Sequence, residues 1–327
     1  MPNVLIMPTP LRHRPGRYRE ILREAGFTPL DPPGHHRLSE DDLIEALSNA
    51  DALLAGGDPV TGRMIRSAPR LRAIARAGVG FESVDLDAAC ERGIPVAITP
   101  GANQESVAEH AIALALALSR NLLGNDRMVR DGGWERRPVR PLRGTTLGVV
   151  GLGRIGRAVA TRARALGMMV VAFSQGRDDA FEAAHQIRLV GLDELLQAAD
   201  VVSVHLPLND QTRGWFDRRA FARMKPGAVI INTARGGLIV ESDLYEALAS
   251  GHLGGAGLDV LNFEPTARDN PLLTLPNVIF SPHIAGVDTT ALDDMAEHAA
   301  RIVSDLYHGL WPEGCVVNEE ALHSWRW

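Results

Sequence analysis

The chain has 327 residues, which is long for one hydrophobic core and comfortable for two domains. Apolar residues make up 45% and charged residues 23%, a composition that excludes disordered and fibrous proteins. The formal net charge of −6 argues against nucleic-acid partners, because binding to a phosphate backbone needs a basic face.

The cysteines and the apolar stretches of the sequence indicate the cellular compartment. The two cysteines, Cys90 and Cys315, lie far apart and predict neither a disulfide framework nor a metal site. The first seven residues lack the basic start and long apolar core of a signal peptide. The longest apolar stretch, residues 111–118, is too short to cross a bilayer. We therefore expect a cytoplasmic protein without a membrane partner, and interpret the six arginines of residues 127–143 as a solvated connector.

The first hundred residues alternate between apolar strands and helices. Continuous apolar strands separated by helices indicate a parallel sheet covered on both faces. This pattern predicts a first α/β unit with strands at residues 4–7, 52–55, 71–75 and 95–98 and helices at residues 18–25 and 85–92.

A long alanine- and leucine-rich helix is predicted at residues 105–129. A helix that is apolar on most sides must be buried in a large interface, between domains or between subunits. Six further strands with intervening helices indicate a doubly wound nucleotide-binding fold, and the tail at about residues 288–307 is again predicted to be helical. The strands are predicted at residues 146–150, 169–173, 201–205, 228–232, 255–259 and 278–281. Short hinges are expected near Thr99-Pro100 and near Gly286.

The sharpest local motif is Gly151-Leu152-Gly153-Arg154-Ile155-Gly156, between a predicted strand and a predicted helix. Gly151 permits the tight turn, Gly153 lets the backbone approach a pyrophosphate, and Gly156 lets helix and strand pack closely. This context predicts dinucleotide binding rather than an ordinary turn.

The acidic residue that should end the next strand and bind the ribose is absent. Ser174 stands at that position, and Arg177 follows three residues later. Losing the carboxylate removes its repulsion of a 2′-phosphate, which Arg177 could pair with, so we favour NADP over NAD. The alternative is that Asp178 or Asp179 curls back to serve NAD.

Three polar residues follow apolar strands at the edge where open α/β sheets bind ligands. Arg235 could hold a substrate carboxylate and polarise its carbonyl with a planar guanidinium. His283 could deliver a proton near neutral pH, and Glu264 could orient and charge that imidazole. Singly, these residues could be a surface cation, a loop acid and a capping residue. Together they predict reduction of a 2-keto acid.

With these residues, the sequence resembles the D-isomer-specific 2-hydroxyacid dehydrogenase family, most closely its phosphoglycerate dehydrogenase and glyoxylate/hydroxypyruvate reductase branches. The matching motifs run in the family's order from Arg76 to Gly286. They are Arg76 to Gly80, Asp85, Thr99 to Gly101, Glu109-His110, Gly151 to Gly156, His205 to Pro207, Asn232 to Gly236, Asp259, Glu264-Pro265 and Ser281 to Gly286.

The resemblance implies two domains. A Rossmann-type NAD(P)-binding domain (residues 100–286) would be inserted in a discontinuous, flavodoxin-like substrate domain (residues 1–99 and 287–327), with the active site in the cleft. It also implies a homodimer formed through the region of the long helix.

The resemblance also assigns roles by position. Arg235 would bind substrate, Glu264 would partner the histidine and His283 would be the acid/base. The loop Gly78-Val79-Gly80, together with Arg235 and His283, would bind the substrate. Coenzyme contacts would come from Gly151, Gly153, Arg154, Ile155, Gly156, Ser174, Arg177, His205, Leu206, Pro207, Thr212, Thr233, Ala234, Asp259, Ala285 and Gly286.

Three other functions are possible for a protein with these motifs. Phosphoglycerate dehydrogenases often carry a C-terminal regulatory domain, for which the sequence after the last helix leaves no room, so a simpler reductase is expected. A dinucleotide-sensing binding protein could share the fold. The same scaffold could also oxidise formate or phosphite.

Overall fold

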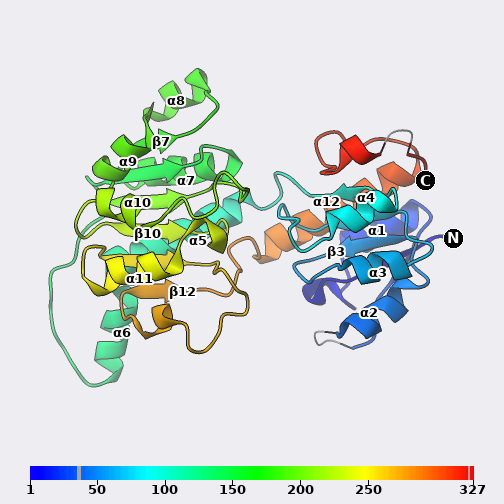
Figure 1. Ribbon diagram of the computed structural model, residues 1–327, viewed down its shortest axis with the longest axis horizontal. Helices are drawn as coiled ribbons and strands as arrows, with labels where there is room; N and C mark the ends of the chain where they lie inside the picture. Colours follow the sequence, from blue (N-terminus) through cyan, green and yellow to red (C-terminus); the bar gives the residue numbers. More distant parts are fainter. Residues whose placement is uncertain (35–37, 323–324) are drawn as a thin grey trace. The chain divides into compact units, whose positions relative to one another are not determined.

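The computed structural model describes residues 1–34, 38–322 and 325–327. It divides into two compact units (Figure 1). Unit 1 comprises Met1–Asn103 and Val287–Trp327, and unit 2 comprises Gln104–Gly286. The polypeptide therefore leaves unit 1, forms the whole of unit 2 and returns.

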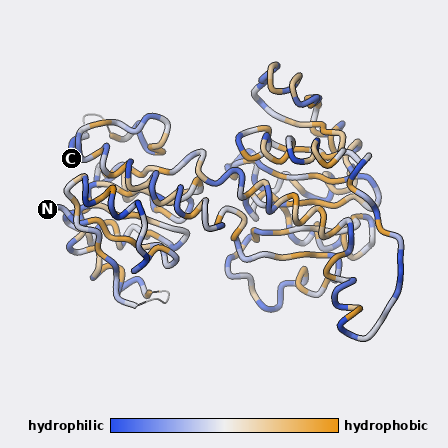
Figure 2. The backbone as a smooth tube through the Cα atoms, turned by 180° about the vertical axis from the view of Figure 1, so that it is seen from behind, coloured by the Kyte–Doolittle hydropathy of each residue, from blue (hydrophilic) through white to orange (hydrophobic). Residues whose placement is uncertain are grey.

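Unit 1 contains a five-stranded parallel sheet in the order β2-β1-β3-β4-β5, which is the flavodoxin-like order. β1 and β3 are almost wholly buried because both of their faces are covered, which explains their unbroken apolar sequences. Figure 2 shows hydrophobic segments running through the interior of each unit. The strands are β1 (Asn3–Ile6), β2 (Thr28–Leu30), β3 (Ala52–Ala55), β4 (Ala73–Arg76) and β5 (Val96–Ala97).

The helices of unit 1 cover the two faces of this sheet. Two of them, α1 (Arg17–Glu24) and α12 (Thr289–Tyr307), share one apolar core with the strands. The other core contains α2 (Glu40–Leu47), α3 (Gly62–Ser67) and α4 (Leu86–Glu91). Polar caps mark several starts, because Ser39, Thr61, Asp85 and Asp288 each accept a hydrogen bond from a first-turn N–H.

Unit 2 contains a seven-stranded parallel sheet in the order β12-β11-β10-β9-β6-β7-β8. The order reverses at β6, as in a doubly wound dinucleotide fold. The prediction of six strands missed β8, a three-residue strand with an exposed arginine at its centre. The strands are β6 (Thr146–Val150), β7 (Met169–Phe173), β8 (Ile187–Leu189), β9 (Val201–Val204), β10 (Val229–Asn232), β11 (Gly255–Leu258) and β12 (Val278–Phe280).

The helices of unit 2 also form two layers. One core contains α5 (Gln104–Ser119) and α7 (Arg154–Ala165), and the other contains α9 (Leu192–Ala198), α10 (Arg218–Arg223) and α11 (Glu241–Ala249). α8 (Asp179–His185) lies beside β8. Short 3-10 turns complete the described elements at Thr9–Leu11, Gly236–Leu238, Pro271–Thr274 and Glu319–Ala321.

The predicted single helix at residues 105–129 is wrong in one respect. The structure has two helices, α5 and α6 (Leu122–Arg130), because Asn121 adopts a left-handed conformation with φ 46°. The apolar face of α5 is buried inside unit 2, against α7, β10 and β11. α6 has no buried residue, and an extended segment follows it (Figure 1).

In unit 1, one strand begins later than predicted, and two helices and a strand are present that were not predicted. β4 begins at Ala73 rather than residue 71, while α2, α3 and β2 were not predicted. β2 includes a proline and has little buried surface, so its apolar signal is weak. Across the described part of the chain, no helix combines the length and apolar character needed to cross a membrane.

Candidate active site

The carboxyl ends of β6, β9, β10, β11 and β12 meet at one edge of the unit 2 sheet, because all of these strands are parallel. Open α/β sheets bind ligands at this edge. The glycine-rich turn, Arg235, Glu264 and His283 all lie in the loops that leave it.

The glycine-rich turn between β6 and α7 has the geometry that a pyrophosphate requires. Gly151 has φ 102°, and a Cβ on Gly156 would lie 2.0 Å from the carbonyl oxygen of Gly151. Gly153, the N-cap residue of α7, has open space where a Cβ would stand and makes no side-chain cap. The first N–H groups of α7 are thus open to an anion, with Arg154 and Ile155 as the first helical residues.

The loop after β9 packs directly on this turn. A Cβ on Gly151 would lie 2.6 Å from the carbonyl oxygen of His205. Burial lowers the pKa of His205 to about 4, so the imidazole is neutral at pH 7. Its Nε2 is 2.8 Å from Ser203 Oγ, whereas its buried Nδ1 has no hydrogen-bond partner.

The other loop residues predicted to contact the coenzyme differ in whether their side chains already have hydrogen-bond partners. Leu206 and Pro207 follow His205, and Thr212 Oγ1 donates to the Pro207 carbonyl over 2.7 Å, which closes the loop internally. After β10, the buried Thr233 Oγ1 has no partner. The unpartnered His205 Nδ1 beside the glycine-rich turn and the unpartnered Thr233 Oγ1 at the same sheet edge fit the polar groups of a dinucleotide.

The loop after β10 presents Arg235. The fully buried Asn232 holds this loop, because its side chain accepts from the Ala234 N–H over 3.0 Å and donates to the Arg235 carbonyl over 2.9 Å. A Cβ on Gly236 would lie 2.1 Å from the carbonyl carbon of Leu261. The Arg235 loop therefore lies against the segment that leads to Glu264.

His283 and Glu264 form a direct pair. His283 Nδ1 lies 2.6 Å from Glu264 Oε2, and Glu264 Oε1 accepts from the Leu261 N–H over 3.0 Å. Both side chains stay accessible, with 47% of His283 and 38% of Glu264 exposed. This carboxylate therefore fixes the imidazole so that its Nε2 remains available for proton transfer.

Electrostatics within this group favour an ionised Glu264. Burial alone would raise the pKa of the carboxyl, but the hydrogen bonds from His283 and Leu261 and the charges of His283 and Arg235 outweigh it and lower the pKa. The structure thus brings together the three residues that the sequence analysis singled out. A guanidinium, a carboxylate and an imidazole in this arrangement can bind an anion and exchange a proton.

The loops of β11 and β12 interlock beside the pair. Asp259, whose side chain is 1% exposed, accepts from Ser281 Oγ, from the Ile284 N–H and from the Ala285 N–H. His283 has φ 54°, which costs about 1–3 kcal/mol for a non-glycine residue and must be held by its surroundings. Contact of Asp259, Ala285 and Gly286 with coenzyme stays a prediction.

The region predicted to select the coenzyme lies between β7 and α8. Asp178 accepts from the Phe181 N–H and pairs with Arg157 at 2.6 Å, and these contacts lower its pKa. Arg177 is 69% exposed and pairs with Asp179 at 3.0 Å and with Glu182 at 3.3 Å. Ser174 follows β7 directly and carries no charge.

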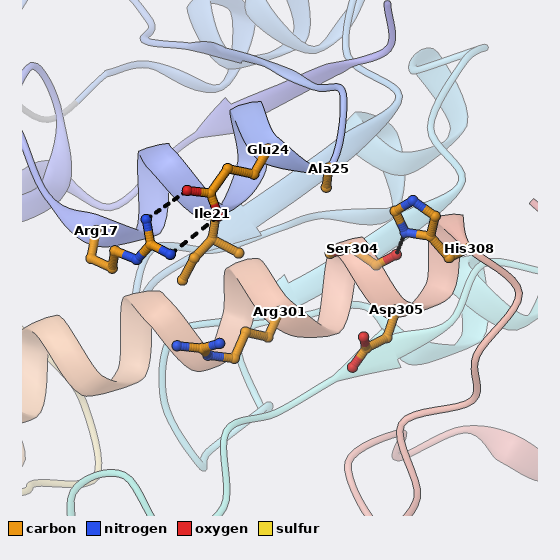
Figure 3. Close-up of a pocket in the computed structure, with 8 residues that line it drawn as sticks. All are labelled: Arg17, Ile21, Glu24, Ala25, Arg301, Ser304, Asp305 and His308. Atoms are coloured by element: carbon orange, nitrogen blue, oxygen red, sulfur yellow. Dashed lines mark hydrogen bonds and ion pairs between the residues drawn. The ribbon is translucent and has the colours of Figure 1, made fainter.

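The predicted substrate loop Gly78-Val79-Gly80 belongs to unit 1, where it follows β4. Gly78 has φ 148°, and its N–H donates to Thr99 Oγ1 over 2.9 Å. The role of this loop stays a prediction. A groove between α1 and α12 also belongs to unit 1 (Figure 3), and within it Arg17 pairs with Glu24 of its own helix at 2.8 Å.

Sequence reasoning gave no role to several residues that shape the site. Asn232 holds the Arg235 loop, and His110 contacts Ser281 at 2.7 Å. Ser106 Oγ donates to the Ala285 carbonyl over 2.9 Å. The available signal was the placement of Ser106 and His110 in an alanine- and leucine-rich helix, where polar side chains that become buried or half-buried need partners.

A family model for the D-isomer specific 2-hydroxyacid dehydrogenase, NAD binding domain, matches residues 112–285, more than half of the chain. The chain belongs to the D-isomer specific 2-hydroxyacid dehydrogenase family. The match spans the glycine-rich turn and all three of Arg235, Glu264 and His283.

Known members of the family resemble most of the chain. D-3-phosphoglycerate dehydrogenase of Mycobacterium tuberculosis is 43% identical over 86% of this chain and 55% of its own length. The chain spans about half the length of this and the other curated phosphoglycerate dehydrogenases that it matches. Glyoxylate reductase of Korarchaeum cryptofilum is 38% identical over 87% of both chains.

A solved structure gives the same picture. D-lactate dehydrogenase of Aquifex aeolicus, complexed with NAD and lactic acid, matches with a TM-score of 0.83 and 29% identity, over 97% of this chain and 99% of that one. The two-domain α/β fold and the assignment to this dehydrogenase family therefore agree.

Proposed function

We propose that this member of the D-2-hydroxyacid dehydrogenase family transfers hydride between NAD(P)H and C2 of a small 2-keto acid, giving a D-2-hydroxy acid. The observation that carries the proposal is the 2.6 Å pair of His283 and Glu264 at the same sheet edge as Arg235 and the glycine-rich turn. The names of the relatives support the substrate class, since one is a glyoxylate reductase.

Each residue has a defined task in the reduction. Arg235 binds the substrate carboxylate and polarises the adjacent carbonyl oxygen. His283 donates its Nε2 proton to the oxygen of that carbonyl as it becomes a hydroxyl, while Glu264 stabilises the charged imidazole through Nδ1. The bound nicotinamide would supply the hydride, and the glycine-rich turn and the start of α7 would hold its pyrophosphate.

NADPH is the proposed coenzyme. Ser174 presents no charge to the ribose, and the Asp178 carboxylate is engaged by Arg157 and by the Phe181 N–H, so it is committed to the start of α8. Arg177 is mostly exposed, and a 2′-phosphate would compete with Asp179 for its guanidinium. We also propose that unit 2 is the coenzyme domain and unit 1 the substrate domain.

A homodimer completes the proposal. α6 has no buried residue, and Leu122 and Leu123 are 59% and 52% exposed. A nine-residue helix gains most of its stability from packing, so an unpacked apolar side favours contact with a second copy. Sedimentation of the wild type should give a dimer, and Leu122→Glu combined with Leu123→Glu should shift it to monomer. The cytoplasmic location remains a prediction.

A substrate panel tests the activity and the coenzyme together. Glyoxylate, hydroxypyruvate, pyruvate and 3-phosphoglycerate would be assayed with both coenzymes in the appropriate direction. We expect kcat above about 1 s⁻¹ for at least one 2-keto acid and a higher kcat/KM with NADPH. A tenfold preference for NADH would contradict the coenzyme assignment. Turnover of formate or phosphite alone, or coenzyme binding without any turnover, would contradict the activity.

A further inference from the structure

α5 contacts the β12 loop through a short chain of hydrogen bonds. His110 Nε2 lies 2.7 Å from Ser281 Oγ, and Ser281 Oγ lies 2.6 Å from Asp259 Oδ1. His110 Nε2 is itself 3.7 Å from that carboxylate oxygen. Three side chains from three separate segments of unit 2 therefore meet directly beside the loop that carries His283.

The direction of each hydrogen bond follows from the number of protons available. The Ser281 hydroxyl has one proton, and the ionised Asp259 carboxylate can only accept, so Ser281 donates to Asp259. Ser281 Oγ must then accept from His110, which places a proton on His110 Nε2. The chain thus runs one way, from the imidazole through the hydroxyl to the carboxylate.

Asp259 connects these hydrogen-bonded side chains to the main chain around His283. Its carboxylate accepts from the Ile284 and Ala285 N–H groups over 3.0 and 2.9 Å, and its carbonyl accepts from the His283 N–H over 2.8 Å. These contacts surround His283, whose left-handed φ of 54° needs such support. A second tie from the same helix comes from Ser106, which donates to the Ala285 carbonyl.

We infer that His110 is a positioning residue for the acid/base: through Ser281 and Asp259 it holds the loop that aims His283. The inference rests on the proposed function, which makes His283 the proton donor. In this inference His110 acts through Ser281, whose Oγ lies 2.7 Å from its Nε2, rather than on the substrate itself. Its side chain is only 24% exposed, which agrees with a specific hydrogen-bonding role, since a largely buried polar group needs a partner.

Substitution of His110 in the whole 327-residue chain tests this role. His110→Leu keeps bulk but removes the donor, whereas His110→Gln can place an amide N–H near the Nε2 position. Because His110→Leu would leave the proton donor His283 misoriented, we expect it to lower kcat about tenfold or more. The Tm should stay close to wild type, and His110→Gln should recover most of kcat. Loss of folding alone would instead lower Tm and affect both variants.

A double variant tests whether the three side chains form one unit. Ser281→Ala breaks the chain at its centre, so adding His110→Leu to it should lower kcat no further. Additive losses would overturn the inference, as would a His110→Leu variant that keeps more than half of the wild-type kcat.

Amide exchange separates this inference from the proposed function. In His110→Leu, the amide hydrogens of Ile284 and Ala285 should exchange faster than in the wild type, whatever the enzyme's substrate. Absence of wild-type turnover would sink the proposed function only. Unchanged exchange at both amides would overturn the role of His110 even in an active enzyme.

Discussion

The carboxyl edges of the two sheets use charged side chains in opposite ways. In unit 1, Arg12 and Arg19 are buried near the end of β1, where Arg12 donates to the Met7 carbonyl and Arg19 pairs with Asp31. In unit 2, His283 and Glu264 remain substantially exposed although they pair with each other. Both edges belong to parallel α/β sheets, so the fold alone does not make one of them a reaction centre.

Accessibility explains the difference. Arg19 also donates to the carbonyls of Leu11 and Arg14, so its guanidinium joins loops of its own unit. His283 has one nitrogen held by Glu264 and the other available for exchange with a ligand. A charged residue after a strand is therefore a functional candidate only when its partners leave one reactive atom accessible.

The largest expected effect is a loss of kcat on substitution at the carboxyl edge of the unit 2 sheet. His283→Ala should lower kcat by about 10²–10⁴-fold, because it removes the proton donor, while the Kd for NADPH stays unchanged. Steady-state kinetics and coenzyme titration measure the two quantities.

Arg235→Ala should chiefly raise KM for the keto acid, which the same steady-state kinetics measure.

A histidine of unit 1 provides the matched control. His308 Nδ1 hydrogen-bonds the Ser304 carbonyl of its own helix, and His308→Ala should leave kcat unchanged. If His283→Ala retains more than about a tenth of the wild-type rate, another group is the proton donor.

The next effect concerns the buried edge of unit 1. Asp31→Asn leaves Arg19 without its charged partner and should lower the free energy of unfolding by about 3 kcal/mol, with the Kd for NADPH unchanged. Burial would raise the pKa of Asp31, but the hydrogen bonds from Arg19 and from the His13 N–H, together with the charges of these two residues, outweigh burial and lower the pKa. The ionised carboxylate therefore stabilises the fold above about pH 4, and the deficit of Asp31→Asn should shrink as the pH falls below that.

Denaturant unfolding at several pH values measures this deficit. Asp41→Asn is the control, because Asp41 is 76% exposed and its pair with Arg63 should contribute less than about 1 kcal/mol. If Asp31→Asn and Asp41→Asn lose equal free energy of unfolding, the buried charges at the edge of unit 1 do not have the structural role proposed for them.

The smallest effect should be at the glycine-rich turn. A Cβ on Gly153 has open space and φ is −78°, so Gly153→Ala should fold normally. It should raise the Kd for NADPH about tenfold, because the methyl group occupies the approach of the pyrophosphate. Gly191 is also an N-cap glycine with open space, at α9, and Gly191→Ala should leave that Kd unchanged. Equal Kd values for the two variants would place the pyrophosphate elsewhere.

Much of the architecture was predictable from local sequence. β3, β6 and β7 have the predicted bounds, because each is a continuous apolar run between clear breaks. The glycine-rich turn and the three polar residues were also visible, since their chemistry depends on residue type and on position after a strand. Short elements such as β2 and β8 were not, because tertiary pairing rather than pattern creates them.

Other features depend on contacts that no local pattern encodes. The break at Asn121 requires one residue to adopt a left-handed backbone inside a helical sequence. The link from His110 to Ser281 joins residues 171 positions apart. Ser174 and Arg177 were identified, but the commitment of Asp178 to Arg157 became clear only from the folded loop.

The discontinuous path of unit 1 has a consequence for synthesis on the ribosome. α12 covers the face of the sheet that includes Val4 and Ile6, yet it is encoded after the whole of unit 2. At typical elongation rates of about 5–20 residues per second, that apolar face of the nascent chain waits roughly 10–40 s for its cover. Unit 2, encoded without interruption, can finish folding first, so the earliest residues to emerge are among the last to be sheltered.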